Sequence, residues 1–386
     1  MSEMQSLHTE VYLDHAATTA IDSRVAQLVM AIMTEEFGNA GSRTHSYGLA
    51  ALRHVNAARE RVASAIGAEP DELTFTSGAT ESDNIALLGL ADHGASSGRR
   101  HIVSTAIEHK AVLEPLALLE ARGFEVTRIA PSGSGHVRAE DVLAAVRPDT
   151  LAVSVMHANN ETGAIQPIEA VAAGLAADGP YFHVDAAQTF GRSTAALRNR
   201  RVDLVSLSAH KIFGPKGVGA LVARRRGVRR PPLAPLMVGG GQERGLRPGT
   251  QPVPLIAGFG LAAELAIKEE RARGAACLAM REQAIAALTR LDPIIHGDWN
   301  LGVLPNILSF AVPGIDSEAV MVALKGLAAI SNGSACTSSR YEPSHVLVAM
   351  GLTADEIAGT VRISWSHDTG PVAWPEIAER LDDLRI

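Results

Sequence analysis

The chain has only two cysteines, Cys277 and Cys336, in 386 residues, so no disulfide framework is available to it. No stretch approaches the roughly 20 uninterrupted apolar residues that a membrane helix needs. Residues 1–10 lack a basic segment followed by an apolar run, so no secretory signal is expected. These absences predict a cytoplasmic protein without a membrane, in which a lone cysteine is more often reactive or incidental than bridged.

Excess positive charge is also missing, because the net charge is -7 at pH 7. This balance argues against a chain built to bind nucleic acid directly. One local basic patch exists at Arg224–Arg226 and Arg229–Arg230. We interpret this patch as a solvated strand end and turn, with a polyanion or partner contact as the alternative. No internal repeat is visible, and 46% hydrophobic residues predict a folded enzyme with a substantial core.

Apolar runs and helix-like segments alternate from about residue 47 onward. Helices are expected over 49–66, 111–119 and 168–176, where apolar residues recur at helical spacing. Short apolar runs predict strands over 73–75, 101–104, 126–129, 151–155, 182–184 and 204–208. This alternation predicts an α/β fold with a large, mostly parallel sheet that helices cover on both faces.

Prolines and glycines break this rhythm between Pro231 and Pro254, which we interpret as a long functional loop before a second domain. Helices are then expected over 258–269, 281–291, 317–324 and 374–384, and strands over 308–312 and 329–331. The predicted division is a large domain of residues 14–253 and a smaller α+β domain of residues 1–13 and 254–386.

Lys211 stands just after the apolar run 204–208, next to His210 and before Gly214. Most lysines are solvated surface charges. Lys211 instead follows a strand, and parallel sheets have their active sites at the carboxyl ends of strands. A partly desolvated amine there loses proton affinity and becomes a nucleophile able to form a Schiff base. Asp185 follows the neighbouring run, where it would either hold the pyridine nitrogen of pyridoxal phosphate or cap a helix.

A phosphate site is expected at Thr76–Glu81, where a glycine-containing turn opens a helix after a strand. The amides and hydroxyls of such a turn face an anion at the helix N-terminus, and Ser208 and His210 would add donors to it. Turns of this kind are common, so the segment gains meaning only together with Lys211 and Asp185.

These segments, in this order, resemble the NifS/IscS-like cysteine desulfurases (group I) of the class V aminotransferase superfamily, which are fold-type I pyridoxal-phosphate enzymes. The resemblance runs over nearly the whole chain, from Tyr12–Thr19 to Val361–Ser364. The motifs that carry it lie between these ends, at residues 77–81, 108–110, 157–163, 206–217, 239–245, 247–250 and 332–337.

The resemblance implies a role for each matching residue. Lys211 would bind pyridoxal phosphate as a Schiff base, Asp185 would pair with its pyridine nitrogen, and His109 would stack on its ring and assist proton transfer. Arg362 would clamp the substrate carboxylate, and Asn39 and Asn160 would contact the substrate. The remaining residues implied at the cofactor are Ala79, Thr80, Asn160, Gln188, Ser208 and His210, with Thr250 reaching over from the other subunit of a homodimer. Judged alone, His109 fits a core histidine, Asn160 a turn residue and Arg362 a surface arginine.

Cys336 distinguishes a desulfurase from other enzymes with this cofactor. It lies in Ser331–Ser339, a run of small and polar residues that would expose a thiol and let it travel. A helix expected after Pro343 would lower the pKa of this thiol through its dipole. By resemblance, Cys336 takes sulfur from L-cysteine as a persulfide and passes it to an acceptor protein. Cys277, in an apparent helix, is interpreted as a packing residue.

Two positions depart from the family pattern: Asn332 stands where many relatives have a serine, and Ala40 where a proline is usual. The tail that longer bacterial relatives use to dock an iron–sulfur scaffold is not seen after the last helix, which puts that partner in doubt. The acceptor stays open among iron–sulfur assembly, tRNA thiolation, cofactor biosynthesis and DNA phosphorothioation. Alternative functions are a selenocysteine lyase, a class V aminotransferase, or a non-catalytic sulfur-trafficking adaptor.

Overall fold

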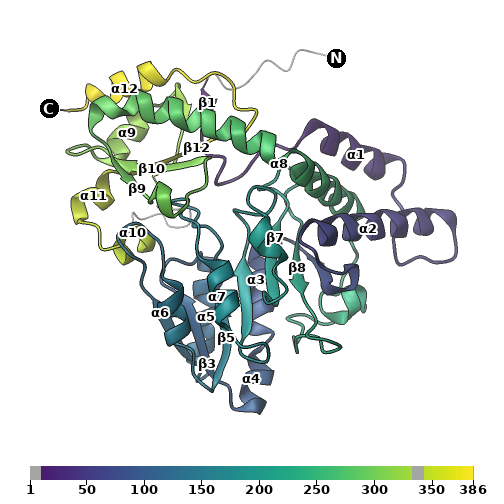
Figure 1. The fold of residues 1–386 in the computed structure, drawn as a ribbon. Helices are drawn as coiled ribbons and strands as arrows, with labels where there is room; N and C mark the ends of the chain where they lie inside the picture. The colour runs from purple at the N-terminus through teal and green to yellow at the C-terminus, as the bar shows by residue number, and fades with distance from the viewer. Residues whose placement is uncertain (1–9, 333–342, 386) are drawn as a thin grey trace.

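The computed structural model describes residues 10–332 and 343–385, and a seven-stranded sheet forms the centre of this described chain (Figure 1). Its order is β2-β8-β7-β6-β5-β3-β4, and only β8 runs antiparallel to its neighbours. The strands are β2 (Leu73–Thr76), β3 (His101–Thr105), β4 (Glu125–Ile129), β5 (Thr150–Ser154), β6 (Tyr181–Asp185), β7 (Leu204–Ser208) and β8 (Gly219–Ala223).

Helices cover both faces of this sheet, because its strands are mostly continuous apolar runs whose successive side chains point to opposite faces. Leu204 of β7 packs in a core with α3 (Ala79–Leu88), α4 (Ala91–Ser97) and α5 (Lys110–Ala121). Val205, the next residue, points to the opposite face and a larger core. The helices on that second face are α1 (Ser23–Thr34), α2 (Ser46–Ala65), α6 (Ala139–Ala144), α7 (Ile168–Gly174) and the first half of α8 (Val253–Leu288).

A second, smaller core lies at the other end of α8, which crosses the top of the molecule in Figure 1. Here an antiparallel sheet has the order β12-β10-β9, and β1 pairs with β11 in parallel. The elements are β1 (Val11–Tyr12), β9 (Ile294–His296), β10 (Ile307–Ala311), β11 (Ala328–Ala329), β12 (Thr360–Ser364), α9 (Ser317–Ala323), α11 (Ala354–Gly359) and α12 (Trp374–Asp382). The short helix α10 (His345–Ala349) packs against the larger core through Val346 and Leu347. The domain boundaries proposed from the sequence stay predictions.

Most strand predictions agree with the structure to within two residues, and the run 204–208 coincides with β7. The prediction of separate helices over 258–269 and 281–291 is wrong, because both belong to the single helix α8. The apolar periodicity fades between them where α8 passes from one core to the other, and Gly274 is tolerated there. The predicted strand over 329–331 is shorter than expected: β11 ends at Ala329, and Ser331 forms an isolated bridge with Arg362.

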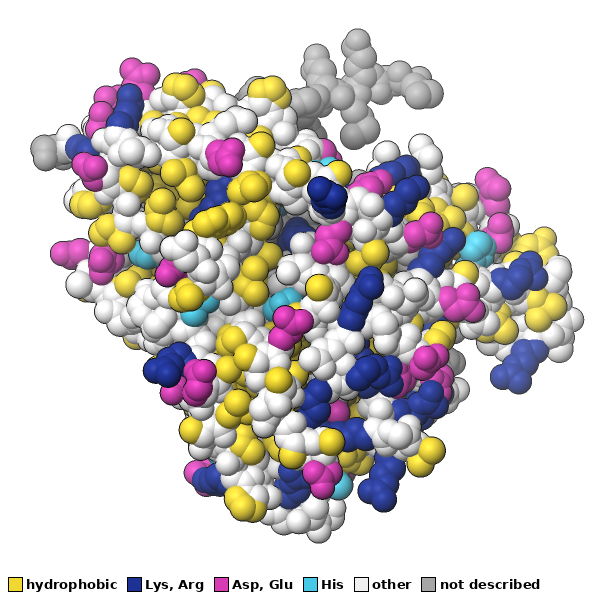
Figure 2. All heavy atoms as spheres, in the orientation of Figure 1, with side chains coloured by type: hydrophobic (Ala, Val, Ile, Leu, Met, Phe, Trp, Pro, Cys, Tyr) yellow, Lys and Arg dark blue, Asp and Glu magenta, His cyan; other side chains and the backbone are white. Residues whose placement is uncertain are grey.

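The interpretation of Arg224–Arg230 as a solvated strand end is wrong for Arg224, whose side chain is 0% exposed. Its guanidinium donates to three backbone carbonyls, those of Ile66, Leu197 and Val202. Neighbouring arginines pair with acids, since Arg226 binds Asp203 and Arg230 binds Asp71. On the face shown in Figure 2, basic and acidic side chains are interspersed. Among the described residues, no helix is both long and apolar enough to cross a membrane.

Candidate active site

A cavity of about 530 Å³ opens where β6 and β7 end and where β12 of the smaller sheet approaches them. The carboxyl ends of parallel strands are the usual place for a site in such sheets. Ten of the residues proposed from the sequence line it: Ala79, Thr80, His109, Asn160, Asp185, Gln188, Ser208, His210, Lys211 and Arg362. The fold thus brings together segments that lie up to 283 positions apart in the chain.

Lys211 follows β7, and its amine lies inside the cavity. The Nζ atom donates hydrogen bonds to the backbone carbonyls of Ala16 at 2.5 Å and Ala17 at 2.8 Å. Burial, followed by the nearby charges of Arg362 and Arg192, lowers the pKa of Lys211 to about 7. A substantial fraction of this amine is therefore neutral near physiological pH, which a nucleophilic lysine requires.

Asp185 ends β6 and presents a buried carboxyl to the same cavity. Its Oδ1 accepts a hydrogen bond from the backbone N–H of Ala187 at 2.8 Å. Burial, reinforced by the neighbouring carboxyl of Asp83, raises the pKa of Asp185 to about 6. A cationic partner inside the cavity would favour the charged form of Asp185, as the pyridinium of pyridoxal phosphate would.

Asp83 is a buried lining residue that the sequence reasoning missed. It lies on α3, and its Oδ1 is 3.4 Å from Nε2 of His183. Burial raises the pKa of Asp83 to about 7. The sequence held one signal for Asp83: it lies four positions after Ala79, the first residue of the helix predicted to open at the site. Residues four positions apart lie on the same face of a helix.

The start of α3, where an anion site was predicted, lines the cavity. Gly78 is the N-cap, and the first amides of a helix have no intrahelical acceptor. The carboxylate of Glu81 accepts from the N–H of Ser77 at 2.6 Å and is held by Arg247, which fixes the turn. Gly219 of β8 permits the close approach of this turn, because a Cβ there would lie 2.6 Å from Cα of Gly78.

Ser208 and His210, at and just after the end of β7, line the same cavity as the turn that opens α3. The Nδ1 atom of His210 lies 3.0 Å from the hydroxyl of Thr18, which fixes the orientation of the ring. Burial lowers the pKa of His210 to about 4, so its ring is neutral at physiological pH. Thr18 is a further lining residue, from the first motif of the sequence.

Arg362 reaches the cavity from β12, so it is not a surface arginine: the residue is only 5% exposed. Its guanidinium donates to Asp14 Oδ1 at 2.6 Å and to the backbone carbonyl of Asn160 at 2.8 Å. Its Nε has no hydrogen-bond partner among the described residues. A buried N–H group without a partner costs free energy, so this guanidinium is suited to donate hydrogen bonds to a bound carboxylate.

His109 is the N-cap of α5, and its Nδ1 accepts a hydrogen bond from the N–H of Ala111 at 3.1 Å. A neutral ring in this position carries its proton on Nε2. Burial, and secondarily the charge of Lys211, lowers the pKa of His109. The ring lines the cavity, which places an acid–base group at the site rather than in the core.

Two of the proposed residues that the structure describes, Asn39 and Thr250, do not line the cavity of this chain. Asn39 is exposed, and its Oδ1 accepts from the N–H of Gly41 at 2.8 Å. Thr250 is also exposed, as a residue assigned to a partner subunit would be. Cys336 lies outside the described residues. The roles of all three stay predictions.

Cys277 is buried in the second half of α8, as a packing residue would be. Burial raises the pKa of its thiol to about 11, so the thiol stays protonated at physiological pH. This is the reverse of what a reactive cysteine needs.

One cavity of this α/β fold thus gathers the amine of Lys211, the carboxyl of Asp185, the start of α3 and the guanidinium of Arg362, a set of groups typical of enzymes that form a Schiff base. Comparison with protein-family models matches residues 11–369 to the class-V aminotransferases. The chain belongs to this family, whose members are pyridoxal-phosphate enzymes.

Individual relatives narrow the comparison further. The cysteine desulfurase IscS of Anaeromyxobacter sp. (strain Fw109-5) is 45% identical over 93% of this chain and 88% of its own. Among solved structures, a NifS-like protein superposes with a TM-score of 0.87 and 38% identity, over 97% of this chain and 98% of that one. DndA from Streptomyces lividans superposes with a TM-score of 0.81 and 51% identity, over 92% and 99%. SspA in complex with cysteine superposes with a TM-score of 0.80 and 35% identity, over 92% of this chain and 98% of that one.

Proposed function

We propose that this protein is a pyridoxal-phosphate-dependent cysteine desulfurase that converts L-cysteine to L-alanine and keeps the sulfur as a persulfide on Cys336. The observation that carries this proposal is the meeting of three groups in one cavity: the Lys211 amine, the Asp185 carboxyl and the Arg362 guanidinium. The IscS relative and the cysteine-bound SspA structure support cysteine as the substrate.

The lining residues fit pyridoxal phosphate. The amides that open α3, together with Thr80, Ser208 and His210, suit a phosphate. Asp185 suits a protonated ring nitrogen, and the NH2 group of Gln188 suits the phenolic oxygen. Lys211 is the only lysine besides Lys216 that lines the cavity within the described chain, and it is the one with the buried amine.

When bound, pyridoxal phosphate supplies an electron sink that stabilises negative charge at Cα of the amino acid. Arg362 would fix the substrate carboxylate, for which its unpartnered Nε is available within the described chain. The amine of Lys211, with its pKa near 7, would remove and return the Cα proton. His109 would assist through the proton on Nε2.

Cys336 would accept the sulfur by attack of its thiolate on the substrate sulfur, as the Cβ–S bond breaks. Reprotonation of the remaining three-carbon fragment gives alanine, so atoms and electrons balance. Ser331, five positions before Cys336, lines the cavity and pairs with Arg362 through two backbone hydrogen bonds of 2.7 and 3.1 Å. Five residues span at most about 18 Å, so Cys336 lies within reach of the site.

The working unit would be a cytoplasmic homodimer in which Thr250 reaches the cofactor of the other subunit, and the persulfide would pass to an acceptor protein. The exposed position of Thr250 supports this arrangement, because the side chain is available to a neighbour. Asn39 would contribute to the substrate pocket from the exposed connection between α1 and α2.

The test measures alanine and enzyme-bound persulfide after L-cysteine is added without a keto acid. Wild type should form both, Lys211→Ala neither, and Cys336→Ser should bind cysteine yet form no persulfide. Cys277→Ser is the matched control and should behave as wild type, because Cys277 is buried in α8.

Alanine and sulfide formation by Cys336→Ser at the wild-type rate would contradict the role of Cys336. A requirement for a keto acid would identify an aminotransferase, and a strong preference for selenocysteine would identify a lyase. Absence of any reaction and of any bound cofactor would leave the adaptor alternative.

A further inference from the structure

Arg192 is a partly buried cation that the proposed reaction does not use. It lies on the turn after β6, behind the active-site cavity. One terminal nitrogen donates to the backbone carbonyl of Lys211 at 2.7 Å. The other donates to the backbone carbonyl and to the side-chain Oε1 of Gln188, each at 3.3 Å. Arg192 therefore joins two residues of the site that come from different turns.

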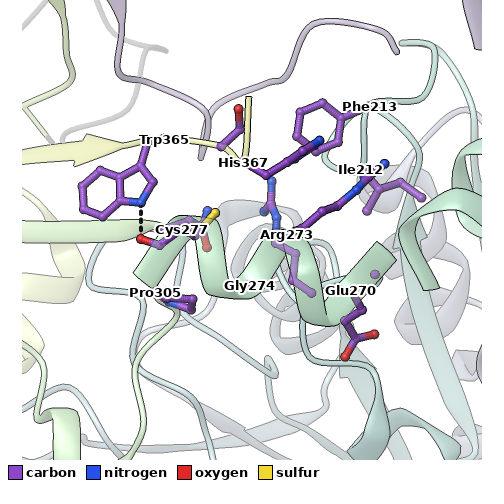
Figure 3. Close-up of a pocket in the computed structure, with 13 residues that line it drawn as sticks. Ile212, Phe213, Glu270, Arg273, Gly274, Cys277, Pro305, Trp365 and His367 are labelled. Atoms are coloured by element: carbon purple, nitrogen blue, oxygen red, sulfur yellow. Dashed lines mark hydrogen bonds between the residues drawn. The ribbon is translucent and has the colours of Figure 1, made fainter. Parts of the chain in front are cut away.

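No carboxylate within the described chain lies within 4.0 Å of this guanidinium. Arg192 lines a second cavity, of about 30 Å³, together with Glu270 and Arg273, which Figure 3 labels. The acid that lines this cavity, Glu270, accepts a hydrogen bond from Thr194 instead, and Arg273 pairs with Glu269. Burial lowers the pKa of Arg192 to about 10, so it keeps its charge at neutral pH. No acid pairs with Arg192 in the described chain, and its donors go to two residues of the active site instead.

The first consequence concerns the amide of Gln188. A guanidinium can only donate hydrogen bonds, so the oxygen of the Gln188 amide must face Arg192. The NH2 group then points the other way and donates to the carbonyl of Ala16 at 2.9 Å. The same carbonyl accepts from the amine of Lys211. Arg192 thus decides which end of the amide faces the cofactor site.

The second consequence concerns charge. Arg192 and Arg362 lower the pKa of the Lys211 amine, whereas Asp14 and Asp185 raise it. The other titratable groups that interact with Lys211 are His109 and His210. Those that interact with Arg192 are His210, Arg273, Cys277 and His15.

We propose that Arg192 is a positioning residue for the reaction: it orients the Gln188 amide toward the cofactor and places an uncompensated positive charge beside Lys211. This inference rests on the proposed function, since it assumes that pyridoxal phosphate is bound at Lys211. The alternative is that Arg192 only stabilises the turn after β6.

The test is a pH titration of the visible absorbance of the pyridoxal-phosphate-loaded protein, with kcat and KM for L-cysteine measured beside it. In Arg192→Met the midpoint of the titration should rise by roughly one pH unit, because a nearby positive charge is removed. We expect kcat to fall about tenfold while KM changes less than about threefold, because Arg192 does not line the substrate cavity. Arg192→Lys keeps the charge and should keep the wild-type midpoint.

Arg198→Met is the matched control, because Arg198 also donates to a backbone carbonyl, but to that of Ala65, which does not line the active-site cavity. It should leave the midpoint unchanged. A wild-type midpoint in Arg192→Met, with or without a lower melting temperature, would overturn the inference. If Arg192→Met does not fold, Arg192→Gln replaces it with the same expectation. Absence of a visible band in wild type would instead overturn the proposed function.

Discussion

The lowered pKa of Lys211 can be tested in the cofactor-free protein. Burial and the charges of Arg362 and Arg192 bring this pKa to about 7, compared with an ordinary lysine value of 10.5. At pH 7 about half of the Lys211 amines are then neutral, whereas only about 0.03% of ordinary lysine amines are. Only the neutral amine attacks an electrophile. At pH 7 Lys211 should therefore react about a thousandfold faster than a lysine of ordinary pKa with the same steric access.

Competitive labelling with trace acetic anhydride between pH 5.5 and 10, read by mass spectrometry of the peptides, measures this directly. The exposed Lys216, in the same loop, is the internal reference. We expect the labelling of Lys211 to reach half of its plateau near pH 7. In Arg362→Gln the midpoint should move upward, because the largest charge acting on the amine is removed. A midpoint at pH 10 or above in the wild type would refute the reasoning.

Three further predictions follow from the packing. Arg224→Ala should lower the free energy of unfolding by about 3–5 kcal/mol in denaturant titrations, because three buried carbonyls lose their donor, whereas the exposed Arg229→Ala should change it by less than about 0.5 kcal/mol. Glu108→Gln should raise the melting temperature relative to wild type increasingly between pH 5 and 8. Burial raises the pKa of Glu108 to about 8, so the unfolded chain ionises first and wild-type stability falls across this range; a pH-independent difference would contradict this. Gly219→Ala should weaken pyridoxal-phosphate binding at least about tenfold in a fluorescence titration, because its Cβ would meet backbone at 2.4 and 2.6 Å. Gly274→Ala, whose Cβ has no neighbour within 4 Å among the described residues, should leave binding unchanged.

Strands buried on both faces were predictable from the sequence, because they are continuous apolar runs. This is why the run 204–208 agrees with β7 and the residues after it were recognised as a site. The strand β8 was missed, because its sequence of small and apolar residues follows a glycine-rich loop and carries no distinct period. The continuity of α8 was missed because its apolar side changes as it passes from one core to the other.

Side-chain burial was the least predictable property. Arg224 was expected in solvent, yet the chain folds three carbonyl groups around it. Arg192 was not recognised, because nothing in the residues beside it indicates that it contacts Lys211, and the one signal for Asp83, its place one turn inside α3, does not show that it approaches Asp185. These are contacts between residues distant in sequence or on separate turns, and a local pattern contains no information about them.

The sequence by itself determined the α/β class, the strand that precedes Lys211 and the acid that ends the neighbouring strand. These features depend on hydrophobic patterns within short segments of the chain. The tertiary structure alone decided that Arg362 of the smaller sheet meets Lys211 of the larger one, and that burial and nearby charge bring the lysine pKa to about 7. Desolvation and Coulomb interactions depend on distances in space, and only the folded chain sets those distances.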